Sequence, residues 1–492
     1  MTALSKITTI VVLLTLAFAG VGLTLHPGSG YPLASYFDVW LWRVVKFSVF
    51  QAFISATFAI AIAVPFAVVL SEKRFYGQWI FRGLLNLFFI MPVLTIVLGV
   101  VNAYGSVVDV FSLKGIIIAH LYLNVPYAVR IFWERLSRIS QTQMQIAKTL
   151  HMSKWQCFRL IRLPIVVSAI RPVFILIFLM CFSSFTIVLT LGGGPANTNL
   201  EVAIFQALKF DFDPNAGAIY AVIHGLIAIV FMMILGRREI FSMEVDRKST
   251  REKSAPTLLQ GGVVLLLLVV LLYPLISLLL HGLSQPWVGS RRLIEAIETS
   301  LLLALGSGLF ATMLALLRSF DKSQNRIVQI IDFGLMILPI MVISTGLFLL
   351  ALRFQIAFKI TTWLIIWLNG LMAMPLILGP LKTRVAVFRD TYGRLSRTLA
   401  LSSWQQFQFI YLPALVRVLP WSFVLAMVLS VGDLGVAALL GSAQFVTIPI
   451  LIYQAMGSYQ MVLASQLTLL LLLICAVLLL IAEWLGEQSN RA

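Results

Sequence analysis

Apolar runs long enough to cross a membrane recur along the whole of this 492-residue chain. A helix needs about 20 mostly apolar residues to span the ~30 Å hydrocarbon core of a bilayer. The runs are continuous and lack the strict alternation of a transmembrane β-barrel, so they predict an all-α polytopic membrane protein with about 12 transmembrane helices. We place these helices near residues 7–25, 45–71, 80–104, 113–134, 165–191, 214–236, 258–282, 295–318, 327–352, 361–383, 414–440 and 458–483.

Charged residues make up only 11% of the chain, against about a quarter in a typical soluble domain. The formal net charge is nevertheless +17, a balance that is also found in nucleic-acid-binding proteins. With the N-terminus in the cytoplasm, however, most of the 36 Lys and Arg residues fall in cytoplasmic loops, with Lys209, Arg291 and Arg292 as exceptions. This is the positive-inside pattern. We therefore expect contact with membrane lipid, no nucleic-acid partner, and both termini in the cytoplasm.

Two moderately polar segments interrupt this apolar background and read almost the same. Thr149–Pro164 is TLHMSKWQCFRLIRLP and Thr398–Pro413 is TLALSSWQQFQFIYLP, with nine of sixteen positions identical at an offset of 249 residues. Apolar segments can look alike simply because both are apolar, but matched Ser, Trp, Gln and Pro residues need another cause. The repeat predicts two copies of one membrane unit, each showing the same surface to a partner.

The repeat extends through both halves in the same order. A polar stretch with alternating charge divides them, so we predict a first membrane unit at residues 1–240, a cytoplasmic linker at 241–257 and a second unit at 258–492. About six helices in each half give both units the same orientation, which makes the repeat parallel. Matched residues outside the polar segments are Pro92 and Pro339, Gly99 and Gly346, Pro126 and Pro375, and Arg135 and Arg384.

Four prolines are expected to shape helices. Pro92 and Pro339 lie inside predicted spans, where proline removes one backbone donor and clashes with the preceding turn, so we expect kinks. Such breaks occur where they face protein or a water-filled pathway, and a bend with only a packing role is the alternative. Pro164 and Pro413 close the two polar segments, and we expect a short helix to end at each Leu-Pro.

Asp433 is an acidic residue inside a predicted span. Ionisable groups at such depth are costly and often functional, so Asp433 is a candidate pathway residue. The alternative is that it lies near the outer helix end and is satisfied by nearby backbone or hydroxyl groups. Its counterpart in the first half is Ser184, so a symmetric charged site is not expected.

Each polar segment carries apolar residues at roughly helical spacing, including Trp155 and Phe158 in the first copy and Trp404 and Phe407 in the second. A short helix with one apolar face produces this pattern. Such a helix could rest on lipid or bind a protein partner. Lipid adhesion needs only apolar area and charge, so the matched Ser, Trp and Gln residues favour a protein partner.

These segments resemble the EAA loops of permease subunits in binding-protein-dependent ABC importers. The family pattern is E-A-A, three residues, G, nine residues, then I-x-L-P. The I-x-L-P end is intact in both loops, 145–164 and 394–413, whereas the opening is degraded. The pattern falls on Gln145, Ile146, Ala147, His151, Ile161, Leu163 and Pro164, and on Arg394, Leu395, Ser396, Ala400, Ile410, Leu412 and Pro413.

The resemblance implies the type I ABC importer permease fold, in a multi-pass protein of the bacterial inner membrane. Its two coupling loops imply two copies of an ABC ATPase subunit in the cytoplasm, and a periplasmic substrate-binding protein on the other side. The chain has no G-x-x-x-x-G-K-[ST] phosphate-binding loop. ATP and Mg are therefore expected on the partner, with no cofactor, metal or catalytic residue in this transport subunit. ATPase docking is assigned to Gln145, Ala147, Thr149, Leu150, His151, Ser153, Trp155, Gln156, Phe158, Thr398, Leu399, Ala400, Ser402, Trp404, Gln405 and Phe407.

Three further segments narrow the resemblance. Gly115–Arg130, Cys181–Pro195 and Ala203–Gly217 are similar to the fused, two-unit permeases of bacterial thiamine importers. This implies transport of thiamine or its phosphate esters, while related fused permeases for ferric iron share the organisation and give an alternative substrate. The alternative of a different class is a secondary transporter with parallel repeats, driven by an ion gradient.

Overall fold

The computed structural model describes residues 2–24, 33–235, 253–254, 256–287, 289–321, 334–335, 338–416, 418–442 and 445–491. Within these residues nine helices are long and apolar enough to cross a membrane, or up to 11 if two bent helix pairs each count as one span. The predicted all-α polytopic membrane fold is confirmed. The predicted linker 241–257, apart from 253–254 and 256–257, lies outside the described residues, and so does most of 327–337.

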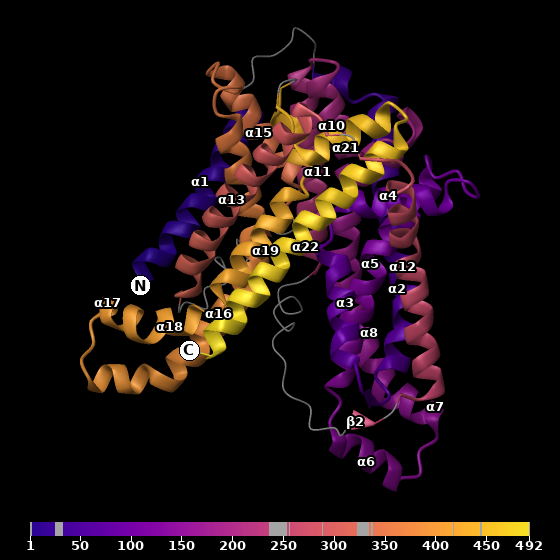
Figure 1. Ribbon diagram of the computed structural model, residues 1–492, viewed down its shortest axis with the longest axis vertical. Coiled ribbons are helices and arrows are strands. Elements are labelled where there is room, and N and C mark those ends of the chain that lie inside the picture. Colours follow the sequence, from indigo (N-terminus) through magenta and orange to yellow (C-terminus); the bar gives the residue numbers. More distant parts are fainter. Residues whose placement is uncertain are drawn as a thin grey trace. The chain divides into compact units, whose positions relative to one another are not determined.

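The chain folds as two compact units that are interleaved in sequence. Unit 1 comprises Met1–Phe37, Leu200–Leu226 and Gly282–Ala492, and unit 2 comprises Asp38–Asn199 and Ile227–His281. The first helix of the chain, α1 (Thr2–Thr24), therefore belongs to unit 1 with most of the second sequence half. The first helix of that second half, α12 (Leu258–Gly282), belongs almost entirely to unit 2 (Figure 1). Each sequence half thus lends its first helix to the other half's spatial unit.

Unit 2 is built around the helix α5, which packs against α2, α3, α4, α8 and α9. On its buried face, Trp133 is 1% exposed and stacks with Phe75. The centroid of the Trp133 ring lies 4.6 Å from the guanidinium carbon of Arg82. The two-residue strands β1 and β2 pair in parallel. The elements are α2 (Val39–Leu70), β1 (Arg74–Phe75), α3 (Gln78–Ile90), α4 (Val93–Tyr104), α5 (Leu113–Ser137), α6 (Gln141–Thr149), α7 (Lys154–Cys157), η2 (Phe158–Arg162), α8 (Leu163–Phe182), α9 (Phe185–Leu191), η3 (Pro195–Asn197), β2 (Lys253–Ser254) and α12.

Unit 1 has its core where α13, α16 and α19 meet. Val12 of α1 is fully buried in this core. Two hydrogen bonds also tie α1 to it: the Thr8 hydroxyl donates to the Leu314 carbonyl at 3.1 Å, and the Trp367 indole N–H donates to the Thr15 hydroxyl at 3.0 Å. The elements are α1, η1 (Leu33–Tyr36), α10 (Leu200–Lys209), α11 (Pro214–Leu235, whose last turns belong to unit 2), α13 (Arg291–Ser319), α15 (Ile340–Arg353), α16 (Thr361–Thr398), α17 (Ser403–Gln406), η5 (Phe407–Tyr411), α18 (Leu412–Leu415), α19 (Leu419–Val431), α20 (Gly435–Leu440), α21 (Ile448–Gly457) and α22 (Met461–Arg491).

Glycines let α1 and α12, the two helices exchanged between the sequence halves, approach their units closely. In unit 1, a Cβ added at Gly346 of α15 would lie 2.2 Å from the carbonyl oxygen of Ala19 on α1. In unit 2, a Cβ added at Gly99 of α4 would lie 3.0 Å from the Cβ of Pro274 on α12. Gly99 and Gly346 are matched positions of the sequence repeat. Small residues commonly allow close crossings of membrane helices, so the repeat preserves the contact that admits the exchanged helix.

Pro92 and Pro339 lie between helical segments instead of kinking a continuous helix. α3 ends at Ile90 and α4 begins at Val93, with a bend of 94° between the two helices. Pro92 is the N-cap of α4 in an extended conformation (φ −54°, ψ 132°), and Pro339 is the N-cap of α15 (φ −59°, ψ 126°). The chain therefore bends at Pro92 as expected, but the bend separates two helices. A residue that precedes proline is disfavoured in the α region, and Met91 is accordingly extended with ψ 139°, which stops the first helix.

Candidate functional site

The first polar segment forms a tight helix–turn–helix in unit 2. α6 ends in a Schellman turn, in which the Met152 N–H donates to the Ala147 carbonyl and the His151 N–H donates to the Lys148 carbonyl, both at 3.0 Å. His151 occupies the left-handed position of this turn, with φ +51°. Glycine adopts that conformation at least cost. This backbone gives a physical reason for the glycine that the family pattern has at this position.

The second polar segment repeats this turn in unit 1. α16 ends at Thr398, the Leu401 N–H donates to the Ser396 carbonyl at 3.0 Å, and Ala400 takes the left-handed position with φ +49°. In Figure 1, α6 and α7 form one end of unit 2, and α17 and α18 follow the end of the long helix α16 in unit 1. The sequence repeat is therefore also a repeat of backbone structure.

Helix capping explains the matched Ser and Gln residues. The Gln156 N–H donates to the Ser153 hydroxyl at 3.2 Å, and the Ser153 N–H donates to the Gln156 side-chain oxygen at 2.8 Å. Ser402 and Gln405 make the same two bonds, at 3.3 and 2.8 Å. This reciprocal capping box fixes the start of each short helix, α7 and α17. The sequence argument counted these residues toward a partner, but local structure accounts for them.

Exposed apolar side chains gather on both loops at matched positions. Trp155 is 66% exposed and Trp404 is 69% exposed. Their rings stack on Phe158 and Phe407, respectively, with centroids 5.6 Å apart in both loops. Clustered large apolar side chains of this kind mark an interaction surface, for a protein partner or for lipid. We define the first apolar quartet as Ile146, Leu150, Trp155 and Leu160, and the second apolar quartet as Leu395, Leu399, Trp404 and Phe409, all more than half exposed.

Three of the residues assigned to docking are buried or make hydrogen bonds within their own loop. Ala147 is buried. The Thr149 hydroxyl donates to the Gln145 carbonyl at 3.1 Å, and the Thr398 hydroxyl donates to the Arg394 carbonyl at the same distance. The sequence reasoning missed Ile146, Leu160 and their counterparts as contact residues. The signal that identifies them is apolar character retained at the 249-residue offset in otherwise polar segments.

The helix that was expected to end at each Leu-Pro continues through it. The π-helical turn η2 joins α7 to α8, with the Leu163 N–H donating to the Phe158 carbonyl, and Lys154–Phe182 is one 29-residue helix. Pro164 lies in the first turn of α8, where a missing N–H is tolerated. In unit 1, η5 and Pro413 make the same junction, after which the chain bends by 64° before α19. The predicted helix ends at these two prolines are therefore wrong.

Each loop is braced against a neighbouring part of its own unit. In unit 2, Arg162 of η2 pairs with Glu72, which follows α2, at 3.8 Å. In unit 1, Phe407 and Tyr411 pack edge-on against Phe320 at the end of α13, with ring centroids 5.9 and 5.3 Å apart. These contacts connect each exposed loop to the membrane helices of its unit.

Asp433 lies between α19 and α20 in unit 1. Its carboxylate accepts hydrogen bonds from the backbone N–H groups of Gly435 and Val436, at 3.1 and 3.2 Å. Such bonds are expected if nearby backbone groups satisfy Asp433, which was the alternative to a pathway role. They do not by themselves indicate a pathway role. The sequence reasoning did not single out a second acidic residue of this unit, Glu201, which is buried on α10.

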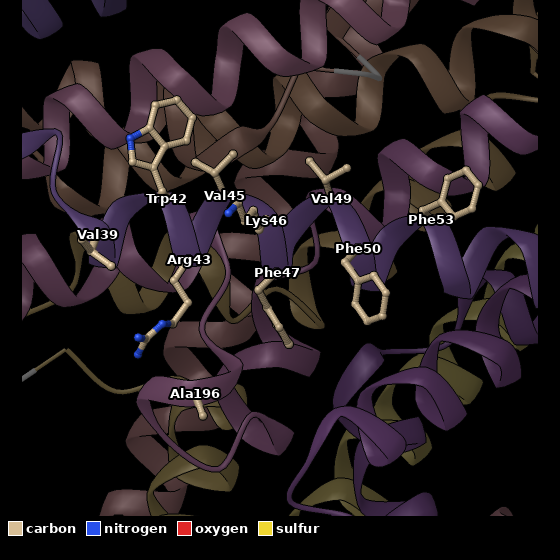
Figure 2. A pocket seen from close by; sticks show the side chains of 10 residues that line it. All are labelled: Val39, Trp42, Arg43, Val45, Lys46, Phe47, Val49, Phe50, Phe53 and Ala196. Atoms are coloured by element: carbon tan, nitrogen blue, oxygen red, sulfur yellow. The ribbon is translucent and has the colours of Figure 1, made fainter.

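A groove of about 1140 Å³ runs along the first turns of α2 in unit 2 (Figure 2). Its walls are mainly apolar, and its charged residues are the cations Arg43 and Lys46. Figure 2 shows Arg43 and Phe47 on the side of α2 that faces Ala196 of η3, and Trp42 on the opposite side. The groove contributes no carboxylate that could pair with an organic cation. The residues that line it are Val39, Trp42, Arg43, Val45, Lys46, Phe47, Val49, Phe50, Phe53 and Ala196.

Two stretches of the chain, residues 59–238 and 305–489, match the family described as "Binding-protein-dependent transport system inner membrane component". The chain belongs to this family. It is therefore a membrane-embedded permease subunit of a transport system, and the matched stretches include both polar loops. The resemblance drawn from the EAA-like loops is confirmed.

Curated relatives align over nearly the full chain. The "Thiamine transport system permease protein ThiP" of Salmonella typhimurium (strain LT2) is 32% identical, with 96% of this chain and 94% of that protein covered. The protein of the same name from Brucella abortus (strain 2308) is 33% identical over 94% and 91% of the two chains. The "Spermidine/putrescine transport system permease protein PotC" of Escherichia coli (strain K12) is 23% identical over 40% of this chain.

Proposed function

We propose that this chain is the membrane-spanning subunit of an ATP-driven importer for thiamine or its phosphate esters. A periplasmic binding protein delivers the substrate, and two copies of a separate ATPase subunit act from the cytoplasm, where both termini of the chain lie. The observation that carries this proposal is the pair of matched apolar quartets, because two equal surfaces suit two equal partners. The lack of a phosphate-binding loop in the sequence supports ATP hydrolysis on those partners.

Continuity of the loop helices supports their role as mechanical couplers. In unit 2, a push on Trp155 acts on the start of the single helix Lys154–Phe182, so a displacement of the loop reaches the membrane as movement of a rigid element. In unit 1, the helix that starts at Trp404 ends at Leu415, before the 64° bend. Closure of the ATPase pair then drives the units between inward-open and outward-open states.

The substrate assignment rests on the relatives. The ThiP proteins are named for thiamine transport and align over more than nine-tenths of this chain. PotC is named for spermidine and putrescine transport but aligns over less than half of it. The ThiP alignments cover both halves of the repeat, and they support thiamine over polyamines.

Reconstituted transport tests the proposal. The chain, its ATPase and its binding protein are assembled in proteoliposomes, and uptake of radiolabelled thiamine is followed with ATP or a non-hydrolysable analogue on the ATPase side. We expect uptake only with hydrolysable ATP and the binding protein, and no loss when an uncoupler is added. Uptake without ATP that collapses with the uncoupler would identify an ion-gradient transporter. Uptake of ferric iron in place of thiamine would contradict the proposed substrate.

A further inference from the structure

Glu201 is a buried carboxyl that lacks a partner within unit 1. It lies in the first turn of α10 and is 1% exposed. Within the described part of the chain, neither of its carboxylate oxygens has a hydrogen-bond partner. Buried polar groups are normally hydrogen-bonded, and a buried charge without a counter-charge is costly. The environment of Glu201 is therefore incomplete without a positively charged group or a proton.

Asp433 supplies a second carboxyl beside it. α10 packs against α20, the helix whose first backbone N–H groups hold Asp433. α10 is not among the helices that could span the membrane. Burial first, and the neighbouring Asp433 second, raise the pKa of Glu201 to about 8. A buried carboxyl without a hydrogen-bond partner, placed beside a second carboxyl, also attracts an external cation.

The basic residues of the surrounding helices do not neutralise this pair. Lys209 is the last residue of α10, eight positions from Glu201 and thus about 12 Å along the helix. Its ammonium donates to the Gly441 carbonyl at 2.6 Å and faces the Phe348 ring. α20 carries no charged residue, and the charged residue of α15 is Arg353 at its last position. Polar neighbours are present instead, since Asn369 donates to the Ser430 hydroxyl at 3.2 Å, three residues before Asp433.

We propose that Glu201 and Asp433 form a single acidic site that pairs with the positive charge of an organic cation during its passage. This inference rests on the proposed function, because the thiazolium ring of thiamine carries such a charge. The site is not duplicated. Aligning AIFQAL (203–208) with LIYQAM (451–456) puts Pro449 opposite Glu201, and Ser184 corresponds to Asp433. One cation site per chain is consistent with one substrate per transport cycle.

Chemical protection tests the site in the wild-type complex. Dicyclohexylcarbodiimide, which modifies protonated carboxyls in apolar surroundings, is applied to the permease–ATPase complex in nanodiscs, and Glu201 modification is quantified by mass spectrometry. We expect thiamine to lower this modification at least about fivefold. The uncharged thiazole half of thiamine, 4-methyl-5-hydroxyethylthiazole, should not protect. Equal modification with and without thiamine would overturn the proposed site.

A neutral variant gives the second measurement. Glu201→Gln keeps the size of the side chain and removes the charge, and we expect the half-saturating thiamine concentration for uptake to rise about tenfold, as for loss of a charged contact. Asp211→Asn removes the same charge from an exposed residue in the loop after α10, and should leave uptake unchanged. If the wild type takes up thiamine and Glu201→Gln has the same half-saturating thiamine concentration, only the proposed site is contradicted. Failure of wild-type uptake would contradict the proposed substrate.

Discussion

Truncation of the two loop tryptophans should abolish tight ATPase binding without unfolding the permease. A tryptophan buries roughly 150–250 Å² when fully covered, and Trp155 and Trp404 are 66% and 69% exposed. About 100–170 Å² of each therefore remains available to a partner. At about 25 cal/mol per Å², covering this area contributes about 3 kcal/mol per loop, as an upper estimate. That corresponds to roughly a 150-fold change in Kd.

The assay is a titration of ATPase subunit onto the permease in nanodiscs by calorimetry. Trp155→Ala should leave one tight and one weak site, and Trp155→Ala with Trp404→Ala should leave two weak sites. Trp287→Ala is the matched control, because this tryptophan is also exposed, at 48%, but lies outside both loops. Binding of the double variant within twofold of wild type would refute the docking role of the apolar quartets.

Three further substitutions test how the loops and helices are built. Ser153→Ala removes one half of a capping box and should cost about 1 kcal/mol, seen as faster amide hydrogen exchange at Gln156; unchanged exchange would contradict the cap. His151→Gly should stabilise the first loop by about 1 kcal/mol, because φ is +51° there, whereas Thr149→Gly at the last residue of α6 should destabilise it by roughly 0.3 kcal/mol. Exchange that shifts in the same direction in both variants would refute the strain argument. Gly346→Ala should lower the stability of unit 1 by about 1–3 kcal/mol by displacing α1, as measured by thermal unfolding, whereas Gly379→Ala meets open space and should not. Equal melting temperatures for the two glycine variants would contradict the close crossing.

The membrane class, the repeat and the family could be predicted because each rests on features that are local in sequence. Apolar runs report spans directly, and the I-x-L-P ends report the loops. The exchange of α1 and α12 could not be predicted in this way. It depends on which helix faces Gly346 or Gly99, and hydropathy does not record which helices are neighbours.

Residues that match between the two loops were attributed to partner binding, but some of them match for a local structural reason. Ser153 and Gln156 recur in the second copy because they cap a helix, and the S-x-x-Q spacing was available in the sequence as that signal. The Leu-Pro junction was misjudged because proline usually stops a helix, whereas a π-helical turn lets the chain continue. Glu201 was missed because it lies between the predicted spans 165–191 and 214–236, where an acidic residue is not unusual. Only the packing of α10 on α20 brings it to Asp433.

The most direct test of the account is the composition of the purified complex. The two apolar quartets lie on separate units and present matched surfaces, so one permease chain should bind two ATPase subunits. Native mass spectrometry of the complex extracted from the membrane measures this ratio. The account predicts one permease to two ATPase subunits, falling to one to one when only Trp155 or only Trp404 is replaced by Ala. A wild-type complex that holds a single ATPase subunit, or none, would contradict it.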